Sequence, residues 1–412
     1  MKIFTSDRFS GRTKYRQHTC ELDSAICVIG LFYSNVIALT EDMIKVLVTG
    51  GLGFIGSHTV DMLVAKGYDV VVLDNLELQV HMGKMPRHKN SHAKYILGDI
   101  RHRKYWLRAL RDVNAIIHLA GAVGVGQSFW QARKYIDVNA GGTATMFDVI
   151  IHDAKLKSSI EKIVVASSKS LYGEGAYRCA VHGMLYPEQR TLSQMKKKEW
   201  EVRCPVCGGG TIPVGIPEEK PPQNLSPYAL SKYATERLAI DFSYALGIPT
   251  VALRYFNVYG PRQSLNNPYT GVIAIFLSRI MSGNSPFLFE DGMQMRDYVY
   301  VEDVARVNVS SLTKGEGIYN VGTGKPHTLL DIVALLNKAT GLDIEPFISG
   351  EFRPGDNRHD FADIGRLTRD FGTISFTEFN LGIRKLVEWS ASARVKDLFE
   401  REERERKRFL AR

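Results

Sequence analysis

A tyrosine and a lysine one helical turn apart are the residues of this chain best suited to proton transfer. Tyr228 and Lys232 follow Pro227, and their spacing puts the phenol and the ammonium on one face of the helix that Pro227 opens. A phenol has a pKa near 10, which must fall by roughly three units before the group works as a base at neutral pH. A neighbouring cation favours the phenolate and lowers that pKa. Such a pair also occurs on exposed helix faces, so its interpretation depends on the motifs around it.

A glycine-rich loop near residue 50 predicts a dinucleotide site. Its spacing is Gly50-x-x-Gly53-x-x-Gly56, and Phe54 and Ile55 begin the helix that follows. The first glycine permits a tight turn, the second lets the backbone approach a pyrophosphate, and the third lets helix and strand pack closely. The N-terminus of the helix then presents free N–H groups to the phosphates.

Acidic residues after the next two hydrophobic runs indicate which dinucleotide binds. Asp74 lies eighteen residues beyond Gly56, where a carboxylate suits the ribose hydroxyls of NAD and repels the 2′-phosphate of NADP. Asp99 is expected to reach the adenine, and the positive nicotinamide ring would help to lower the pKa of the tyrosine. The other residues expected to line the cofactor are Asn75, Ile100, Leu119, Ala120, Gly121, Tyr228 and Lys232.

Upstream of the tyrosine, Ser168 ends a hydrophobic run and offers a hydroxyl for a substrate oxygen. A long segment, residues 174–223, separates it from the tyrosine and is predicted to be a zinc ribbon. Its four metal-binding side chains, in C-x-x-H and C-x-x-C pairs, would complete a structural tetrahedral site: Cys179, His182, Cys204 and Cys207. The alternative is a redox pair of the last two cysteines, which the glycines and proline that follow them disfavour.

Short β-branched runs alternate with helical segments from residue 45 onward. Several runs are apolar on both faces, as strands buried in a parallel sheet must be. The pattern predicts an α/β fold with a Rossmann-type doubly wound parallel sheet. The expected strands are Lys45–Thr49, Asp69–Asp74, Lys94–Leu97, Ala115–Ala120, Lys162–Ser168 and Thr250–Phe256, with helices over Phe54–Lys66 and Tyr135–Ile151.

Punctuation by proline and glycine divides the chain into four parts. Residues 1–42 are expected to be a poorly ordered extension, whose uncharged stretch Ala25–Leu39 is too short for a membrane span. Residues 43–256 are predicted to form the NAD-binding domain. Residues 257–390 are predicted to form a smaller substrate-binding domain, partly interleaved with it, and residues 391–412 a charged helical tail.

Composition excludes several classes of protein. The 412 residues are 44% hydrophobic and 24% charged, as in ordinary globular proteins. A cluster of Lys and Arg over residues 84–111 contributes to the net charge of +9, but it lacks the interleaved aromatics of a nucleic-acid site. Five cysteines are too few, and odd in number, for a disulfide scaffold. We therefore expect no nucleic-acid or membrane partner and a cytoplasmic location.

Together these motifs resemble the extended short-chain dehydrogenase/reductases, the NAD-dependent epimerase/dehydratase family, from Met43 to about Trp389. The resemblance implies that Ser168, Tyr228 and Lys232 are catalytic and that Asn139 is a structural residue beside the cofactor. It also implies a nucleotide-sugar substrate and a homodimer. The residues that it implies for the substrate, among them arginines whose forks suit phosphate, are Asn257, Arg296, Arg353 and Asp356.

The residues after Ser168 favour epimerisation within this family. Related sugar 4,6-dehydratases carry an Asp-Glu pair there to eliminate water, whereas this chain has Lys169-Ser170. The Cys-bearing insert and three further stretches are similar to dTDP-L-rhamnose 4-epimerases, which make dTDP-6-deoxy-L-talose by transient oxidation at C4. These stretches are Ala122–Ser128, Asn266–Val272 and Phe289–Met293. The alternatives are a UDP-sugar 4-epimerase, a net nucleotide-sugar oxidoreductase, and a non-catalytic dinucleotide- or nucleic-acid-binding protein.

Overall fold

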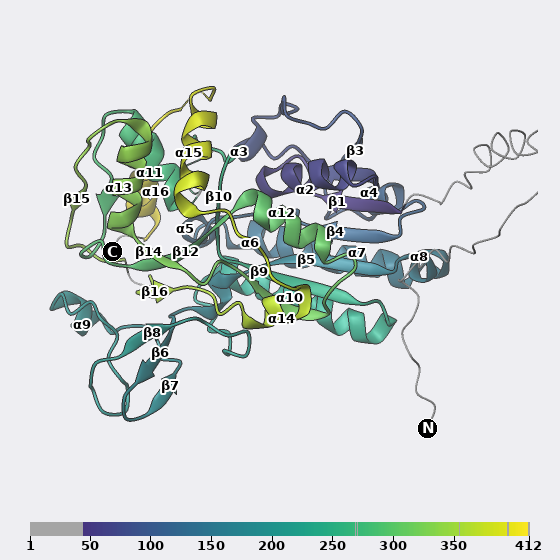
Figure 1. Ribbon diagram of the computed structural model, residues 1–412. Helices are drawn as coiled ribbons and strands as arrows, with labels where there is room; N and C mark the ends of the chain where they lie inside the picture. Colours follow the sequence, from purple (N-terminus) through teal and green to yellow (C-terminus); the bar gives the residue numbers. More distant parts are fainter. Residues whose placement is uncertain (1–43, 268, 270, 354, 394, 411–412) are drawn as a thin grey trace, which may run out of the picture. The chain divides into compact units, whose positions relative to one another are not determined.

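A seven-stranded parallel sheet organises the computed structural model, which describes residues 44–410 except 268, 270, 354 and 394 (Figure 1). The expected extension 1–42, with its apolar stretch, lies outside the described residues. Among the residues that are described, no helix combines the length and apolar character needed to cross a bilayer.

The sheet has the order β13-β9-β5-β4-β1-β2-β3, with every neighbouring pair parallel. Its strands are β1 (Lys45–Thr49), β2 (Asp69–Asp74), β3 (Lys94–Leu97), β4 (Ala115–His118), β5 (Lys162–Ser168), β9 (Thr250–Tyr255) and β13 (Gly317–Val321). All expected strands are present, two of them ending one or two residues early. This order confirms the predicted Rossmann-type doubly wound sheet.

Helices cover both faces of this sheet because its strands are apolar on both sides. On one face, α2 (Phe54–Ala65), α12 (Val301–Ser310) and α14 (Gly365–Phe371) share a core with β1, β2 and β9. On the other, α4 (Arg103–Ala109), α7 (Gly142–Ile151), α8 (Ala154–Ser159) and α10 (Pro227–Leu246) pack against β4 and β5.

The seventh strand comes from beyond residue 256, where the sequence suggested that the second domain begins. Strand β13 pairs with β9 from Gly317↔Val251 to Val321↔Tyr255. Its glycine-rich surroundings concealed it, because β13 is defined by pairing with a strand far away in sequence rather than by its own pattern. The interleaving that was expected is therefore larger than residues 257–390 suggest.

The rest of the chain after β9 builds a second core beside the sheet. Four short strands pair there, β10 (Asn257–Tyr259), β12 (Met295–Tyr300), β14 (Pro326–Thr328) and β16 (His359–Asp360), and β11 (Phe287–Leu288) pairs with β15 (Phe347–Ile348). The helices are α11 (Val272–Met281), α13 (Leu329–Thr340), α15 (Phe379–Ser390) and α16 (Phe399–Leu410). The charged tail is thus helical, and Phe399 at its start is buried beside Phe287 and Arg279.

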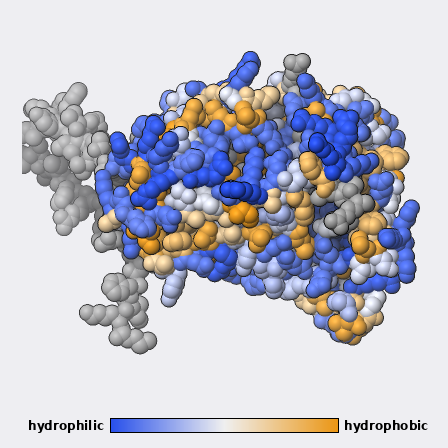
Figure 2. All heavy atoms as spheres, turned by 180° about the vertical axis from the view of Figure 1, so that it is seen from behind, coloured by the Kyte–Doolittle hydropathy of each residue, from blue (hydrophilic) through white to orange (hydrophobic). Residues whose placement is uncertain are grey.

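The insert between β5 and α10 folds as a three-stranded antiparallel sheet of order β7-β6-β8 (Figure 1, lower left). Its elements are β6 (Ala176–Cys179), β7 (Gly183–Leu185), α9 (Leu192–Lys196) and β8 (Ile212–Val214). Hydrophobic side chains gather on its outer part (Figure 2, lower right), where Val181, Val206 and Ile212 are exposed.

Candidate active site and metal centre

The glycine loop after β1 packs so closely against neighbouring backbone that a side chain could not replace its first or third glycine. Gly50 has φ +68°, and a Cβ on it would lie 2.8 Å from the backbone of Ala120. A Cβ on Gly56 would lie 2.1 Å from the carbonyl oxygen of Gly50. Helix α2 begins after Gly53 with no side-chain cap, so the N–H groups of its first turn, at Phe54 and Ile55, remain for a ligand. This cradle fits a pyrophosphate.

The two acidic residues expected at the cofactor lie at the ends of β2 and β3. Asp74 is buried and accepts hydrogen bonds from the N–H groups of Leu52 at 3.1 Å and Leu76 at 2.9 Å. Burial alone would raise the pKa of Asp99, but two hydrogen bonds from Arg101 and the charge of that arginine lower it to about 2. The carboxylate of Asp99 is therefore ionised at neutral pH, and the carboxylate of Asp74 is held in place beside the glycine loop by its bond from Leu52.

The other expected cofactor residues fall into two groups. Asn75 is exposed beside Asp99, and Leu119 and Gly121 follow β4 at the same edge of the sheet. Ile100, by contrast, is buried against Gly142, so its side chain belongs to the hydrophobic core.

Asn139 lies in a π-helical turn, η1 (Ile136–Gly141), which interrupts the single helix expected over Tyr135–Ile151. Its amide accepts from the N–H of Ala122 at 2.7 Å and donates to Ser231 at 2.8 Å. The wider turn frees its carbonyl, which accepts from the hydroxyls of Thr143 and Thr235. Asn139 thus ties the loop after β4 to helix α10.

The serine, tyrosine and lysine expected to be catalytic meet where β5 ends and α10 begins. Ser168 is the last residue of β5, and Tyr228 is buried in the first turn of α10, edge-on to Tyr135 with 6.1 Å between ring centroids. Lys232 follows one turn later and is 6% exposed, and its ammonium group makes no hydrogen bond to the described residues. The three side chains form one buried polar set.

Burial shifts the pKa values of the two titratable members of this set, Tyr228 and Lys232, in opposite directions. Burial raises the pKa of Tyr228, and interaction with the Ser168 hydroxyl opposes this only in part. Burial lowers the pKa of Lys232 to about 8, while the charge of Glu236 acts in the opposite direction. A cationic ring bound beside Tyr228 would oppose the effect of burial and lower the pKa of the phenol. The oxidised nicotinamide ring carries such a positive charge.

A buried ion pair braces these residues from behind. Arg254 on β9 donates to both oxygens of Glu236 at 2.9 and 2.7 Å, and neither residue is more than 4% exposed. Ser167, next to Ser168, donates to the same carboxylate at 2.6 Å. Glu236 lies one turn beyond Lys232 on α10. The pair therefore joins β5, β9 and α10, a role that the sequence did not indicate.

Three of the four residues expected at the substrate lie together in the second core. Asn257 on β10 donates to the carbonyl of Asp297 on the paired strand β12 at 2.9 Å. Arg296, on the same strand, is 3.3 Å from Asp356 and 3.1 Å from Asp360. Its other N–H groups donate to backbone carbonyls, so this guanidinium holds the loop that carries Asp356.

Arg353, the fourth residue expected at the substrate, has unused donor capacity. Its guanidinium lies 4.0 Å above the ring of Phe289, and its Nε is buried without a hydrogen-bond partner among the described residues. A terminal nitrogen donates to Glu403 of helix α16 at 3.0 Å. A cation held in this way can bind an anionic ligand that takes the place of the glutamate.

Lys169 links the two groups of residues. It follows Ser168 and donates to Asp360 at 2.6 Å, and the same Asp360 oxygen lies 3.1 Å from Arg296. The sequence drew attention to Lys169 only because acids are missing there. Its ion pair with Asp360, 191 residues later in the chain, shows that Lys169 connects the end of β5 to β16.

The stretches Ala122–Ser128 and Asn266–Val272 meet beside the tyrosine. A Cβ on Gly124 would lie 2.9 Å from the Tyr135 hydroxyl and 3.3 Å from the Cβ of Tyr269. The side chain of Gln79 donates to both Gln127 and Asn267 at 3.2 Å. The two stretches therefore lie beside Tyr135, whose ring contacts that of Tyr228.

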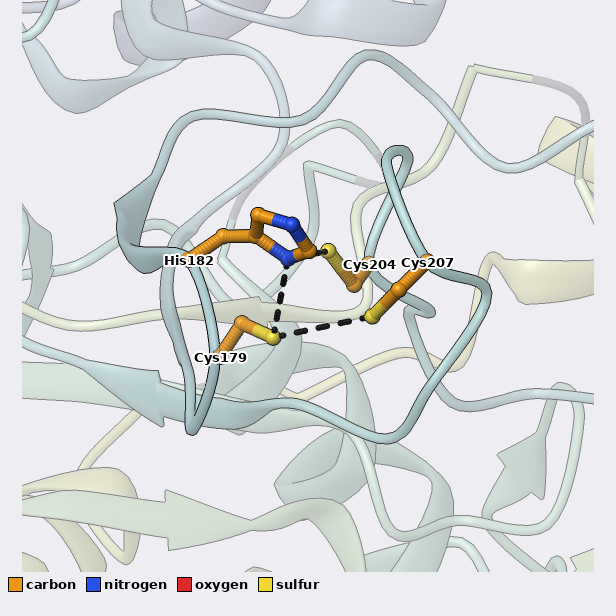
Figure 3. A group of neighbouring side chains, drawn as sticks. All are labelled: Cys179, His182, Cys204 and Cys207. Atoms are coloured by element: carbon orange, nitrogen blue, oxygen red, sulfur yellow. Dashed lines mark hydrogen bonds between the residues drawn. The ribbon is translucent and has the colours of Figure 1, made fainter.

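Four side chains of the insert form a candidate metal centre (Figure 3). The sulfur of Cys179 is 3.6 Å from Nδ1 of His182 and 3.9 Å from the sulfur of Cys207, and the sulfur of Cys204 is 3.5 Å from the same Nδ1. Zinc–sulfur bonds of about 2.3 Å in a tetrahedron place sulfurs about 3.8 Å apart. Hydrogen bonds from backbone N–H groups lower the pKa of the Cys179 and Cys204 thiols. The donor set thus fits a structural zinc ion.

Zinc analysis of the purified protein is expected to find about one ion per chain. Cys204→Ser is expected to lower zinc content and stability together, because an ion present at a thousand times its Kd stabilises the folded state by about 4 kcal/mol. Elemental analysis and thermal unfolding of both proteins measure this. A wild-type protein that contains no metal and unfolds at the same temperature as Cys204→Ser would contradict the assignment of a zinc site.

Comparisons with known proteins agree with this geometry. The model of the NAD dependent epimerase/dehydratase family matches residues 206–322, and that of GDP-mannose 4,6 dehydratase matches residues 47–182. A dTDP-L-rhamnose 4-epimerase of Burkholderia thailandensis is 34% identical over 87% of this chain and 98% of its own length.

Solved structures of UDP-glucose 4-epimerases have the same fold. The enzyme of Thermotoga maritima, with UDP-glucose, has a TM-score of 0.69 and 30% identity, covering 85% of this chain and 99% of its own. That of Thermus thermophilus, with NAD, has a TM-score of 0.66 and 31% identity over 85% and 100%. The chain belongs to the NAD-dependent epimerase/dehydratase family.

Proposed function

We propose that this protein interconverts dTDP-L-rhamnose and dTDP-6-deoxy-L-talose. It is an isomerase, an NAD-dependent nucleotide-sugar 4-epimerase. The observation that carries the activity is the buried set of Ser168, Tyr228 and Lys232 beside a glycine loop shaped for a dinucleotide. The similarity to the Burkholderia thailandensis enzyme over 98% of its length supports the choice of sugar.

In this mechanism the chain's residues move one proton and hold the rest of the substrate. Tyr228, as phenolate, removes the proton of the C4 hydroxyl, Ser168 holds the same oxygen, and Lys232 stabilises the phenolate. NAD, when bound, supplies a reversible hydride acceptor at C4. Because both faces of C4 must be presented in turn, the sugar needs freedom while its diphosphate stays bound. Arg353 is suited to hold the diphosphate, with Glu403 as the group that the phosphate replaces.

The second candidate is a UDP-sugar 4-epimerase, because the Thermotoga maritima structure contains UDP-glucose. The same buried set would serve either sugar nucleotide. Lys169, in the position where an acid would be needed for water elimination, forms an ion pair with Asp360 instead, which speaks against dehydration.

Incubation with dTDP-L-rhamnose is expected to give the 4-epimer as the only stable product, with no net NADH. The reason is that the hydride returns to the same carbon, so NAD is regenerated in each turnover. Proton NMR of the products and absorbance of the reduced nicotinamide measure this, with UDP-glucose in a parallel reaction. Steady NADH accumulation would indicate a net oxidoreductase, and turnover of UDP-glucose alone would favour the second candidate.

The remaining assignments belong to this proposal. NAD would bind to residues 43–256, the sugar nucleotide to residues 257–390, and zinc to the insert. The enzyme would be a cytoplasmic homodimer, a subunit number that light scattering of the purified protein tests.

A further inference from the structure

Two buried arginines join the insert to the loop between β15 and β16. Arg190, from the insert, donates to both oxygens of Glu290 at 2.9 and 2.8 Å. Arg358, from the loop, donates to Glu290 at 2.9 Å and to Asp291 at 2.7 and 2.8 Å. Each arginine side chain is 1% exposed. A buried carboxylate that two arginines share fixes the relative positions of the segments that contribute these side chains.

The insert also holds the backbone of the loop directly. Arg190 donates to the carbonyl oxygen of Asp356 at 3.1 Å, and both oxygens of Glu174 accept from the N–H of Arg358, at 2.9 and 3.0 Å. Glu201 accepts two hydrogen bonds from the guanidinium of Arg358, at 2.9 and 2.6 Å. These contacts hold the backbone at Asp356 and Arg358, three and five residues after Arg353.

We propose that the insert positions the substrate-binding loop, with Glu201 as a positioning residue for the nucleotide diphosphate. The inference rests on the proposed function, since Arg353 and Asp356 are the loop residues assigned to that ligand. The described residues between 349 and 358 in this loop, 354 not being among them, have no helix or strand. Fixing such a segment in its bound conformation lowers the entropic cost of binding and so lowers KM.

Glu201 separates this role from a purely structural one. Its side chain is 62% exposed and contacts Arg358 and His359, both at the end of the loop. It contacts neither the glycine loop nor the Ser168, Tyr228 and Lys232 set. Removing its charge should therefore affect substrate binding and leave the NAD site and the chemical step unchanged.

The test compares Glu201→Gln with Glu199→Gln in the full-length protein. Glu199 lies in the same segment and forms an exposed ion pair with Arg203 at 3.3 Å. Glu201→Gln is expected to raise KM for dTDP-L-rhamnose about tenfold, equivalent to about 1.4 kcal/mol, with kcat within about twofold and NAD content unchanged. Amide hydrogen exchange in residues 350–361 should accelerate. Glu201→Asp, which keeps the charge, should recover part of the affinity, and Glu199→Gln should behave like wild type.

Two results would overturn the inference. One is unchanged KM and unchanged exchange in Glu201→Gln. The other is a raised KM together with a lower kcat and a lower NAD content, which would indicate a general structural defect. If wild type does not turn over dTDP-L-rhamnose, the proposed function fails on its own. The exchange measurement, which needs no substrate, still decides whether the insert holds the loop.

Discussion

Tyr228→Phe is expected to lower kcat by about three orders of magnitude, within the range of about 10²- to 10⁴-fold for losing a general base. The phenylalanine keeps the ring and its edge-on contact with Tyr135, so only the hydroxyl is lost. NAD content should be unchanged, because the tyrosine lies outside the glycine loop. Initial rates with dTDP-L-rhamnose and the NAD content of the purified variant measure the two effects.

Tyr233→Phe is the matched control. Tyr233 lies on the same helix, and its hydroxyl makes no hydrogen bond to any described residue. This variant should keep wild-type activity. Full activity in Tyr228→Phe would remove the tyrosine from the mechanism, and equal losses in both variants would point to packing of α10.

The pH dependence of kcat tests whether Lys232 lowers the pKa of Tyr228. Lys232, with a pKa of about 8, is charged below that pH and then favours the phenolate of Tyr228. Lys232→Met removes the charge and raises the pKa of the tyrosine, so the acidic limb of kcat should move to higher pH by about 1–3 units. A limb that stays in place would show that the lysine does not act on the tyrosine.

Glu236→Gln is expected to destabilise the protein by about 3–5 kcal/mol. It would leave the guanidinium of Arg254 buried without its counter-charge. The variant would also replace one of the two oxygens that accept from Ser167 and Arg254 with an amide NH2 group, which cannot accept. Urea unfolding followed by circular dichroism measures the change, and activity should fall as well, because Ser167 adjoins Ser168.

The double variant Glu236→Gln with Arg254→Met provides the control. With both charges gone, no uncompensated ion remains, so it should be clearly more stable than the sum of the single losses predicts. Additive losses, or a loss below about 1 kcal/mol in Glu236→Gln, would mean that the pair is not a coupled unit.

Sequence reasoning found what is local and missed what depends on distant contacts. The strands, the glycine loop and the Cys/His pairs follow from spacing within a few residues. The π-turn at Asn139 did not, because it depends on Ser231 and Thr235 on another helix. Nor did the arginines of the insert interface, since Glu174 meets Arg358 across 184 residues. A charged residue in an irregular segment looks the same in sequence whether its partner is water or a buried carboxylate.

The antiparallel pairing within the insert also has a consequence for how the chain folds. Between Tyr172, which ends the short 3-10 helix after Ser168, and Pro227 the chain runs for about 54 residues, and closing a loop costs more entropy as it lengthens. Because β6 pairs directly with β8, Ala176 opposite Val214, most of that length is already closed off. The remaining path is about 15 residues, which reduces the closure cost by about 1 kcal/mol. A large insertion can therefore stand between two residues that must meet, provided that its own ends are held together first.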